Sequence, residues 1–236
     1  MSNKLIKNNN SKGKSSKSKV NGKVNTIAEN ELQNNGISAL AKNKYTVPAI
    51  AAVALLAIIV LLVIVNPFKS KPKNYFADIE IKDMGTITVE LNAEEAPITV
   101  ANFVKLSKEG FYDGLTFHRI IEDFMMQGGD PDGNGLGGSG TDIKGEFSKN
   151  GVENNLSHTR GAISMARSDE YDSASSQFFI VHKDSTFLDG KYAAFGYVTS
   201  GMDIVDKICT EAEPTDGNGS IAKEDRPVIN KITIRE

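Results

Sequence analysis

In the larger, C-terminal part of the chain, polar and apolar residues alternate in short segments, a pattern typical of strands with one buried face. The alternation is clearest at Asp78–Lys82 and Thr86–Leu91, which are joined by Asp83, Met84 and Gly85. Two alternating segments on either side of a short turn with glycine predict a β-hairpin. We expect further strands at 116–121, 124–127, 162–165, 177–181, 193–198 and 228–234.

Two other segments carry apolar residues at helical spacing. In the first, Val100, Phe103 and their apolar neighbours follow Pro97, which suits a first helical turn, and precede Gly110, which suits a helix end. The second helix is expected at 202–208. Many short strands and only two helices predict a mainly β fold, a closed or nearly closed antiparallel barrel rather than a parallel sheet.

One long segment, 128–161, has no strand or helix period and is rich in Gly, Asp, Asn and Ser. Long irregular connections inside compact domains are commonly functional loops, so we expect this segment to shape a site. Its glycines do not indicate a phosphate-binding loop, because they lack the flanking strand, the helix start and the Lys-Ser/Thr pair of such sites.

Composition divides the chain into four parts. Residues 1–44 hold nine lysines and two glutamates with few large apolar side chains, which predicts a disordered tail of charge +7. The segment 45–67 contains a continuous apolar run from Val47 to Val65, interrupted only by a proline, and predicts a transmembrane helix of about 28 Å. A linker at 68–75 and a folded domain at 76–236 follow.

The apolar run could also belong to a cleaved signal peptide. It is longer than the usual apolar region of such peptides, and no small-residue cleavage site follows it, so we favour an anchor. Nine lysines precede the run and only Lys69, Lys71 and Lys73 follow closely, which places the N-terminus in the cytoplasm. The domain is then expected outside the cell membrane.

From residue 74 onward the chain holds 15 basic and 28 acidic side chains, a charge of −13. This charge argues against nucleic-acid binding, which needs a basic face. Cys209 is the only cysteine, which excludes an internal disulfide, and its apolar spacing predicts a packed helix face. The lysine-rich tail is either a solvated segment or a polybasic arm.

The candidate chemistry lies around residue 123. If the strand at 116–121 alternates regularly, Phe117, Arg119 and Ile121 share one face, and Met125 and Gln127 share a face of the next strand. A guanidinium on an apolar face is unfavourable without a partner. Two explanations remain open at this point, an internal ion pair or a role facing a ligand. The possible ion-pair partners are Glu122, Asp123 and Asp130.

Five motifs, in this order, resemble those of the cyclophilin family of peptidyl-prolyl cis/trans isomerases: 117–119, 124–130, 164–167, 176–180, and 187–191 with 195–196. The similarity covers 76–236, and the loop at 168–175 is similar to that of bacterial members. The resemblance implies a closed eight-stranded antiparallel barrel capped by two helices, isomerase activity on X-Pro bonds, and neither cofactor nor metal. A non-catalytic scaffold or chaperone of the same fold that binds proline peptides is the alternative.

The resemblance also implies a role for individual residues. Arg119 would be catalytic, and Gln127 would hydrogen-bond the substrate backbone. The pocket for the proline ring would be formed by Phe124, Met125, Phe179 and Leu188. The remaining substrate-binding residues would be Phe117 and His118 beside the arginine, Gly135, Ala166, Arg167 and Ser168 along the peptide groove, Gln177 beneath it, and Phe187 and Tyr192.

Three of these positions depart from the family pattern. Phe187 stands where many members have tryptophan, and it lacks the indole N–H, so we expect weakened binding of cyclosporin but continued turnover. Tyr192 stands at a frequent histidine position, and Arg167 at a frequent asparagine, where the family's contact is largely through the backbone.

Overall fold

A computed structural model gives the positions of residues 75–236. The tail expected at 1–44, the membrane span expected at 45–67 and the linker up to residue 74 lie outside the described residues. Within residues 75–236, no helix has the length and apolar character needed to cross a membrane.

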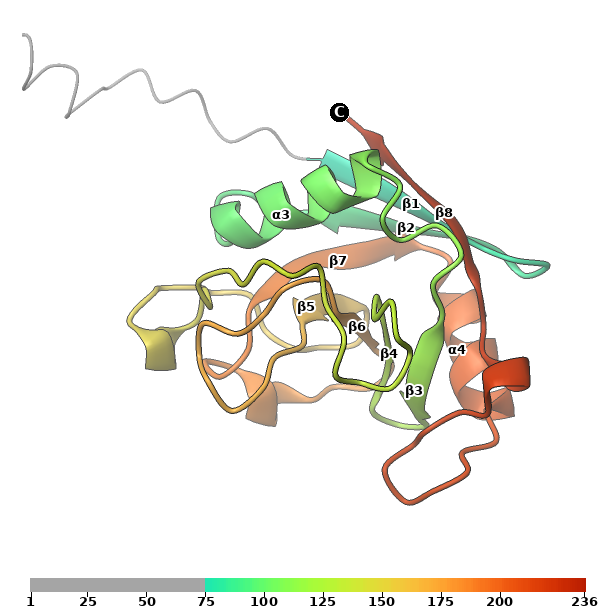
Figure 1. Ribbon diagram of the computed structural model, residues 1–236. Coiled ribbons are helices and arrows are strands. Elements are labelled where there is room, and N and C mark those ends of the chain that lie inside the picture. Colours follow the sequence, from blue (N-terminus) through green and yellow to red (C-terminus); the bar gives the residue numbers. More distant parts are fainter. Residues whose placement is uncertain (1–74) are drawn as a thin grey trace, which may run out of the picture. The chain divides into compact units, whose positions relative to one another are not determined.

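Eight antiparallel strands and two helices form the domain (Figure 1). The strands are β1 Tyr75–Ile81, β2 Gly85–Leu91, β3 Phe117–Ile121, β4 Met125–Gly128, β5 Ala162–Met165, β6 Phe178–Val181, β7 Ala194–Ser200 and β8 Ile229–Arg235. The helices are α3 Pro97–Lys108 and α4 Met202–Glu211, with short 3₁₀ turns η1 Ser148–Asn150, η2 Thr186–Leu188 and η3 Lys223–Asp225. Each expected strand and helix is confirmed, with bounds shifted by a few residues.

The sheet is a half-barrel rather than the closed barrel expected from the sequence. Its strand order is β3-β4-β6-β5-β7-β2-β1-β8, so β3 and β8 are the two end strands. The outer edge of β3 instead bonds the segment that precedes β8. Phe117 donates its N–H to the carbonyl of Pro227 (3.0 Å), and Ile120 donates to that of Gly219 (2.8 Å). This irregular segment satisfies the edge groups that a β3–β8 ladder would otherwise use.

An aromatic cluster holds α3 against the sheet. Phe103 of α3 lies 5.2 to 5.4 Å, between ring centroids, from Tyr112, Phe178 and Phe195, all of them fully buried. The contacts of Phe178 with Phe103 and with Tyr112 are edge-to-face, a favourable arrangement for aromatic rings. The helix α3 lies against β8, and α4 against β2 and β4, so the two helices cover different parts of the curved sheet (Figure 1).

The cysteine behaves as its spacing predicts. Cys209 is buried on the inner side of α4 together with Val205 and Ile208. Burial raises the pKa of its thiol to about 12. The thiol is therefore a packed, protonated group at neutral pH rather than a thiolate.

The N-terminus of α3 is capped by a residue from the long loop. Ala96, at the cap position, offers no side-chain acceptor. The carboxylate of Glu146 accepts the backbone N–H groups of Ile98 (3.0 Å) and Thr99 (2.8 Å) and the Thr99 hydroxyl (2.7 Å). Glu146 is only 2% exposed. A negative charge at a helix N-terminus is favourable, so this contact fastens the loop to the helix.

As predicted, the segment 128–161 contains no strand between β4 and β5, only the turn η1. It is nevertheless ordered by a second buried carboxylate. Asp130 is 1% exposed and accepts the N–H groups of Asp132 (2.9 Å), Asn134 (2.9 Å) and Gly135 (2.6 Å). A Cβ at Gly137 would overlap this carboxylate, which explains a glycine at that position. The loop is thus a preorganised wall.

Candidate active site

A β-bulge changes the face on which Phe117 lies. The pairing of β3 with β4 shifts register between Phe117 and Arg119, so Phe117 and Ile120 both point into the core. The Phe117 ring packs edge-on against Phe178 at 5.9 Å. The prediction that Phe117 shares a face with Arg119 and contacts substrate is wrong, because the extra residue of a bulge reverses the strand alternation.

Arg119 lies on the open side of β3 and is partly buried. Its Nε donates to the backbone carbonyl of Asn218 (2.8 Å), and one Nη donates to the side-chain oxygen of Gln127 (3.2 Å) and lies 3.8 Å from the sulfur of Met125. Burial lowers the pKa of Arg119, while the charges of Tyr192 and Asp216 oppose this effect. A guanidinium still keeps its proton at neutral pH.

The ion pair that the sequence left open does not form. Among residues 75–236, Arg119 has no salt bridge with Glu122, Asp123 or Asp130. Asp123 instead pairs with Lys183 (3.0 Å). The charge of Arg119 is therefore not neutralised by a carboxylate contact and faces the cavity beside it.

That cavity has a volume of about 350 Å³, and apolar and aromatic side chains line it together with Arg119, Gln127 and Arg167. Met125, Phe179 and Leu188 form its buried floor, and they pack together as a small hydrophobic cluster separate from the main core. Phe187, which is 61% exposed, stands at the mouth with its ring 5.6 Å from that of Phe124. The full lining is Arg119, Phe124, Met125, Gln127, Ala166, Arg167, Phe179, Phe187, Leu188 and Tyr192. We call this space the apolar pocket.

A second cavity of about 470 Å³, here the side groove, adjoins the apolar pocket and shares Gln127, Ala166 and Arg167 with it. Gln127 donates to the Gln177 side chain (2.8 Å), which in turn donates to the carbonyl of Gly137 (2.8 Å). This chain of amides joins the sheet to the preorganised loop. The other lining residues are Gly135, Leu136, Gly137, Gly138, Gly140, Asp142, Ser168, Ser173, Ser175 and Gln177.

The structure therefore brings together all the predicted site residues except two. Phe117 lies in the core, and His118 is buried beside the site but lines neither cavity. Within residues 75–236, neither ring nitrogen of His118 has a hydrogen-bond partner. Burial lowers the pKa of His118, and Arg226 and Arg119 add to this against the opposing charge of Asp130. His118 is thus neutral at neutral pH.

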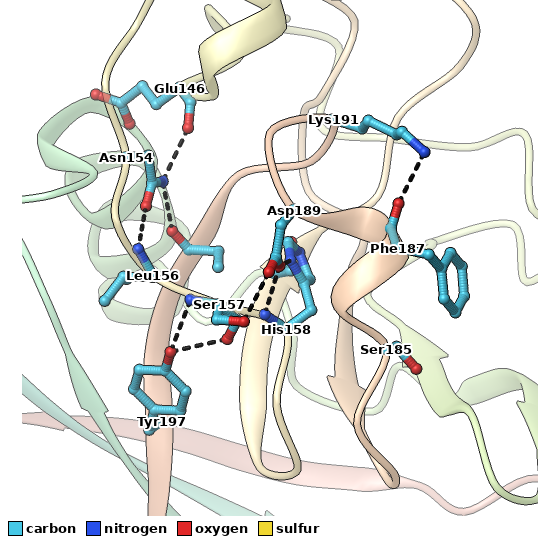
Figure 2. Close-up of polar contacts among 12 residues, drawn as sticks. Glu146, Asn154, Leu156, Ser157, His158, Ser185, Phe187, Asp189, Lys191 and Tyr197 are labelled. Atoms are coloured by element: carbon cyan, nitrogen blue, oxygen red, sulfur yellow. Dashed lines mark hydrogen bonds and ion pairs between the residues drawn. The ribbon is translucent and has the colours of Figure 1, made fainter.

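One polar network beneath the apolar pocket has no signal in the sequence (Figure 2). His158 is fully buried, and its Nδ1 lies 2.8 Å from the carboxylate of Asp189, while its Nε2 lies 2.9 Å from the hydroxyl of Ser164. A carboxylate only accepts, so Nδ1 of the neutral ring carries the proton. Asp189 also accepts from Ser157 (2.7 Å), and the His158 ring stacks on Phe179 at 6.0 Å. The network supports both η2 and the pocket floor.

Asn218 is a second contact that sequence reasoning missed. It reaches Arg119 from 99 residues further along the chain, in the irregular segment before β8. The contact uses a backbone carbonyl, so the side-chain type at 218 carries no signal for it. Only the close approach of two distant segments identifies it.

We expect the folded domain to lose stability as the pH falls below about 6.5. Burial lowers the pKa of His118 and of His158, the latter against the opposing Asp189. Unfolding therefore takes up protons below the ordinary histidine pKa, and stability falls by up to about 1.4 kcal/mol per pH unit for each histidine. Urea titrations between pH 7.5 and 5 measure this slope.

The variant His118→Leu removes one of the two groups and should flatten the slope of stability against pH, because leucine does not titrate. An unchanged slope in this variant would show that His118 does not contribute to the acid sensitivity.

Comparisons with known proteins agree with the motifs. Residues 76–236 match the family model described as cyclophilin type peptidyl-prolyl cis-trans isomerase/CLD. The chain is 46% identical over 146 residues to peptidyl-prolyl cis-trans isomerase B of Bacillus subtilis (strain 168), covering 62% of this chain and 93% of that protein. It is 46% identical over 138 residues to a peptidyl-prolyl cis-trans isomerase of Helicobacter pylori (strain ATCC 700392 / 26695), covering 58% and 81%.

Solved structures show the same similarity. A crystal structure of a Cryptosporidium parvum cyclophilin type peptidyl-prolyl cis-trans isomerase superposes with a TM-score of 0.59 at 28% identity, covering 70% of this chain and 99% of that one. The same protein, solved in the presence of the dipeptide Ala-Pro, gives a TM-score of 0.58, with coverage of 68% and 99%. The chain therefore belongs to the cyclophilin-type peptidyl-prolyl cis-trans isomerases and catalyses the isomerisation of X-Pro peptide bonds.

Proposed function

We propose that Arg119 is the catalytic residue of this isomerase and that the apolar pocket holds the proline ring. The observation that carries the proposal is the guanidinium itself. It is partly buried and held by the Asn218 carbonyl and Gln127, has no salt bridge among residues 75–236, and lines the cavity. The direct test is the rate of cis-to-trans conversion of a proline peptide by Arg119 variants of the full chain.

The chemistry requires only a placed positive charge. The barrier to rotation about a peptide bond is about 18–20 kcal/mol, because the nitrogen lone pair is delocalised into the carbonyl. Rotation localises that lone pair on a pyramidal nitrogen. A guanidinium directed at the prolyl nitrogen stabilises this transition state more than the planar ground state, which lowers the barrier. Such a step forms no covalent intermediate.

The other residues orient the substrate. Met125, Phe179, Leu188 and Phe124 surround the ring and hold it while the acyl side turns. Gln127 uses its oxygen for Arg119 and one N–H for Gln177, which leaves it a second N–H for a substrate carbonyl. The dipeptide Ala-Pro in the structure of the Cryptosporidium parvum relative supports a proline ligand.

The side groove would take the residues that flank the proline. It joins the apolar pocket at Gln127 and Ala166. Several glycines line it and leave backbone N–H and carbonyl groups accessible, which suits binding of an extended peptide. Gly135, Ser168 and Gln177 all line it, which supports a role for them in binding the peptide. Weak cyclosporin binding is expected, because Phe187 offers no N–H donor at the exposed mouth.

We further propose that residues 47–65 anchor the enzyme in a cell membrane with the tail in the cytoplasm and the domain outside. The support is the length of the apolar run and the excess of lysines before it. Exported or surface polypeptides would then be the clients, since prolyl isomerisation can limit their folding. A bacterial cell is the setting that the loop at 168–175 favours.

Protease added to intact cells is expected to digest the domain and to spare the tail 1–44 if this orientation is correct. Antibodies against each part, used on blots before and after detergent treatment, make the measurement. Digestion of the tail with protection of the domain would reverse the orientation, and release of the whole chain by a salt wash would argue against an anchor.

A further inference from the structure

The guanidinium of Arg167 lies among three aromatic rings. Its central carbon is 5.1 Å from the ring centroid of Phe147, 5.1 Å from that of Tyr171 and 4.6 Å from that of Tyr192. Cation–π contacts of this kind are stabilising, and more so where water is excluded. Three rings from three separate segments thus converge on one charge.

The donors of Arg167 are directed to backbone carbonyls. Nε and one Nη donate to the carbonyl of Lys191 (3.1 and 2.8 Å), and the other Nη donates to those of Ser168 (2.7 Å) and Asp169 (3.2 Å). Lys191 in turn donates its Nζ to the carbonyl of Phe187 (2.8 Å; Figure 2). The N–H groups of the Arg167 side chain are therefore bonded to backbone carbonyls of the protein itself rather than directed at a ligand.

Two of the residues that contact Arg167 line a cavity, Tyr192 in the apolar pocket and Ser168 in the side groove. Arg167 lines both the apolar pocket and the side groove. Phe187 and Tyr192 belong to the apolar pocket, whereas Ser168 belongs to the side groove. Arg167 therefore lies at the boundary between the two cavities.

We propose that the Arg167 side chain is a positioning residue that sets the partition between the apolar pocket and the side groove, and thereby the affinity for peptides that occupy both. The inference rests on the proposed function of these cavities. A planar guanidinium can stack between rings and bond carbonyls on two sides at once, which a lysine ammonium cannot do. Arg119 keeps its own partners, so the rate at saturating peptide should be preserved.

The test compares full-length Arg167→Ala and Arg167→Lys with the parent on a peptide that extends several residues to each side of proline. We expect KM to rise about tenfold in both variants, a change of about 1.4 kcal/mol, with kcat within about twofold of the parent. Calorimetric titration of the same peptide should show the same loss of affinity. The matched control is Arg160→Lys, since Arg160 pairs with Asp206 outside both cavities and should leave KM unchanged.

A merely structural role predicts the opposite kinetic pattern. Partial unfolding lowers the concentration of active enzyme, so apparent kcat falls while KM stays at the parent value. That result, or an unchanged KM in Arg167→Lys, would overturn the inference. If the alanine variant does not fold, Tyr171→Leu removes one ring that lines neither cavity and should raise KM about threefold. The proposed function is tested separately by the isomerase rate of Arg119→Ala, which does not depend on Arg167.

Discussion

Arg119→Ala is expected to lower kcat/KM for a proline peptide about 100- to 1000-fold, the usual effect of removing one preorganised transition-state donor. The effect should fall on kcat, because the floor of the apolar pocket is formed by other residues and still binds the ring. NMR exchange spectroscopy with catalytic amounts of enzyme measures the rate of cis–trans conversion, and titration of the same peptide measures its binding.

Two further variants sharpen this result. Arg119→Lys keeps the charge but cannot hold the Asn218 carbonyl and Gln127 while facing the cavity, so it should also be strongly impaired. The control is Arg160→Ala. Arg160 lines neither cavity and pairs with Asp206, so this variant should retain the parent rate. Parent-like turnover by Arg119→Ala would remove the catalytic role from this residue.

Glu146→Ala is expected to lower the free energy of unfolding by about 3 kcal/mol. The change leaves the N–H groups of Ile98 and Thr99, together with the Thr99 hydroxyl, without their buried acceptor at the start of α3. It also removes a negative charge from a helix N-terminus. Urea unfolding at pH 7, followed by circular dichroism, makes the measurement.

Glu146→Gln keeps one acceptor oxygen and should lie between the parent and the alanine variant. The control is Glu109→Ala at the C-terminal end of α3, where an exposed carboxylate lies 3.5 Å from Lys105, and its loss should change stability by less than about 0.5 kcal/mol. Equal stability of Glu146→Ala and Glu109→Ala would show that the cap contributes nothing.

The secondary structure could be predicted because its signals are local. The hairpin of β1 and β2, the helix that starts at Pro97 and the strands around residue 123 each follow from spacing within about ten residues. Most pocket residues were instead expected from the family resemblance that short motifs carry. Met125, Phe179 and Leu188 do meet in one buried cluster.

The errors arose where local pattern and packing disagree. Regular alternation placed Phe117 beside Arg119, but the bulge between them turned the Phe117 ring into the core. A closed barrel was expected, yet the segment containing Gly219 and Pro227 occupies the outer edge of β3. The position of a bulge and the segment that bonds a strand edge both depend on how distant parts of the chain pack together, and residue spacing does not encode this packing.

The sequence by itself determined the elements, the family and the identity of the pocket residues, since these depend on residue type and near neighbours. The tertiary structure alone decided that Arg119 is held by Asn218, that α3 is capped by Glu146, and that Arg167 joins the walls of two cavities. Each of these contacts joins a side chain to a distant segment, often at a backbone carbonyl or N–H. Every residue carries those groups, so only the folded geometry selects which of them meet.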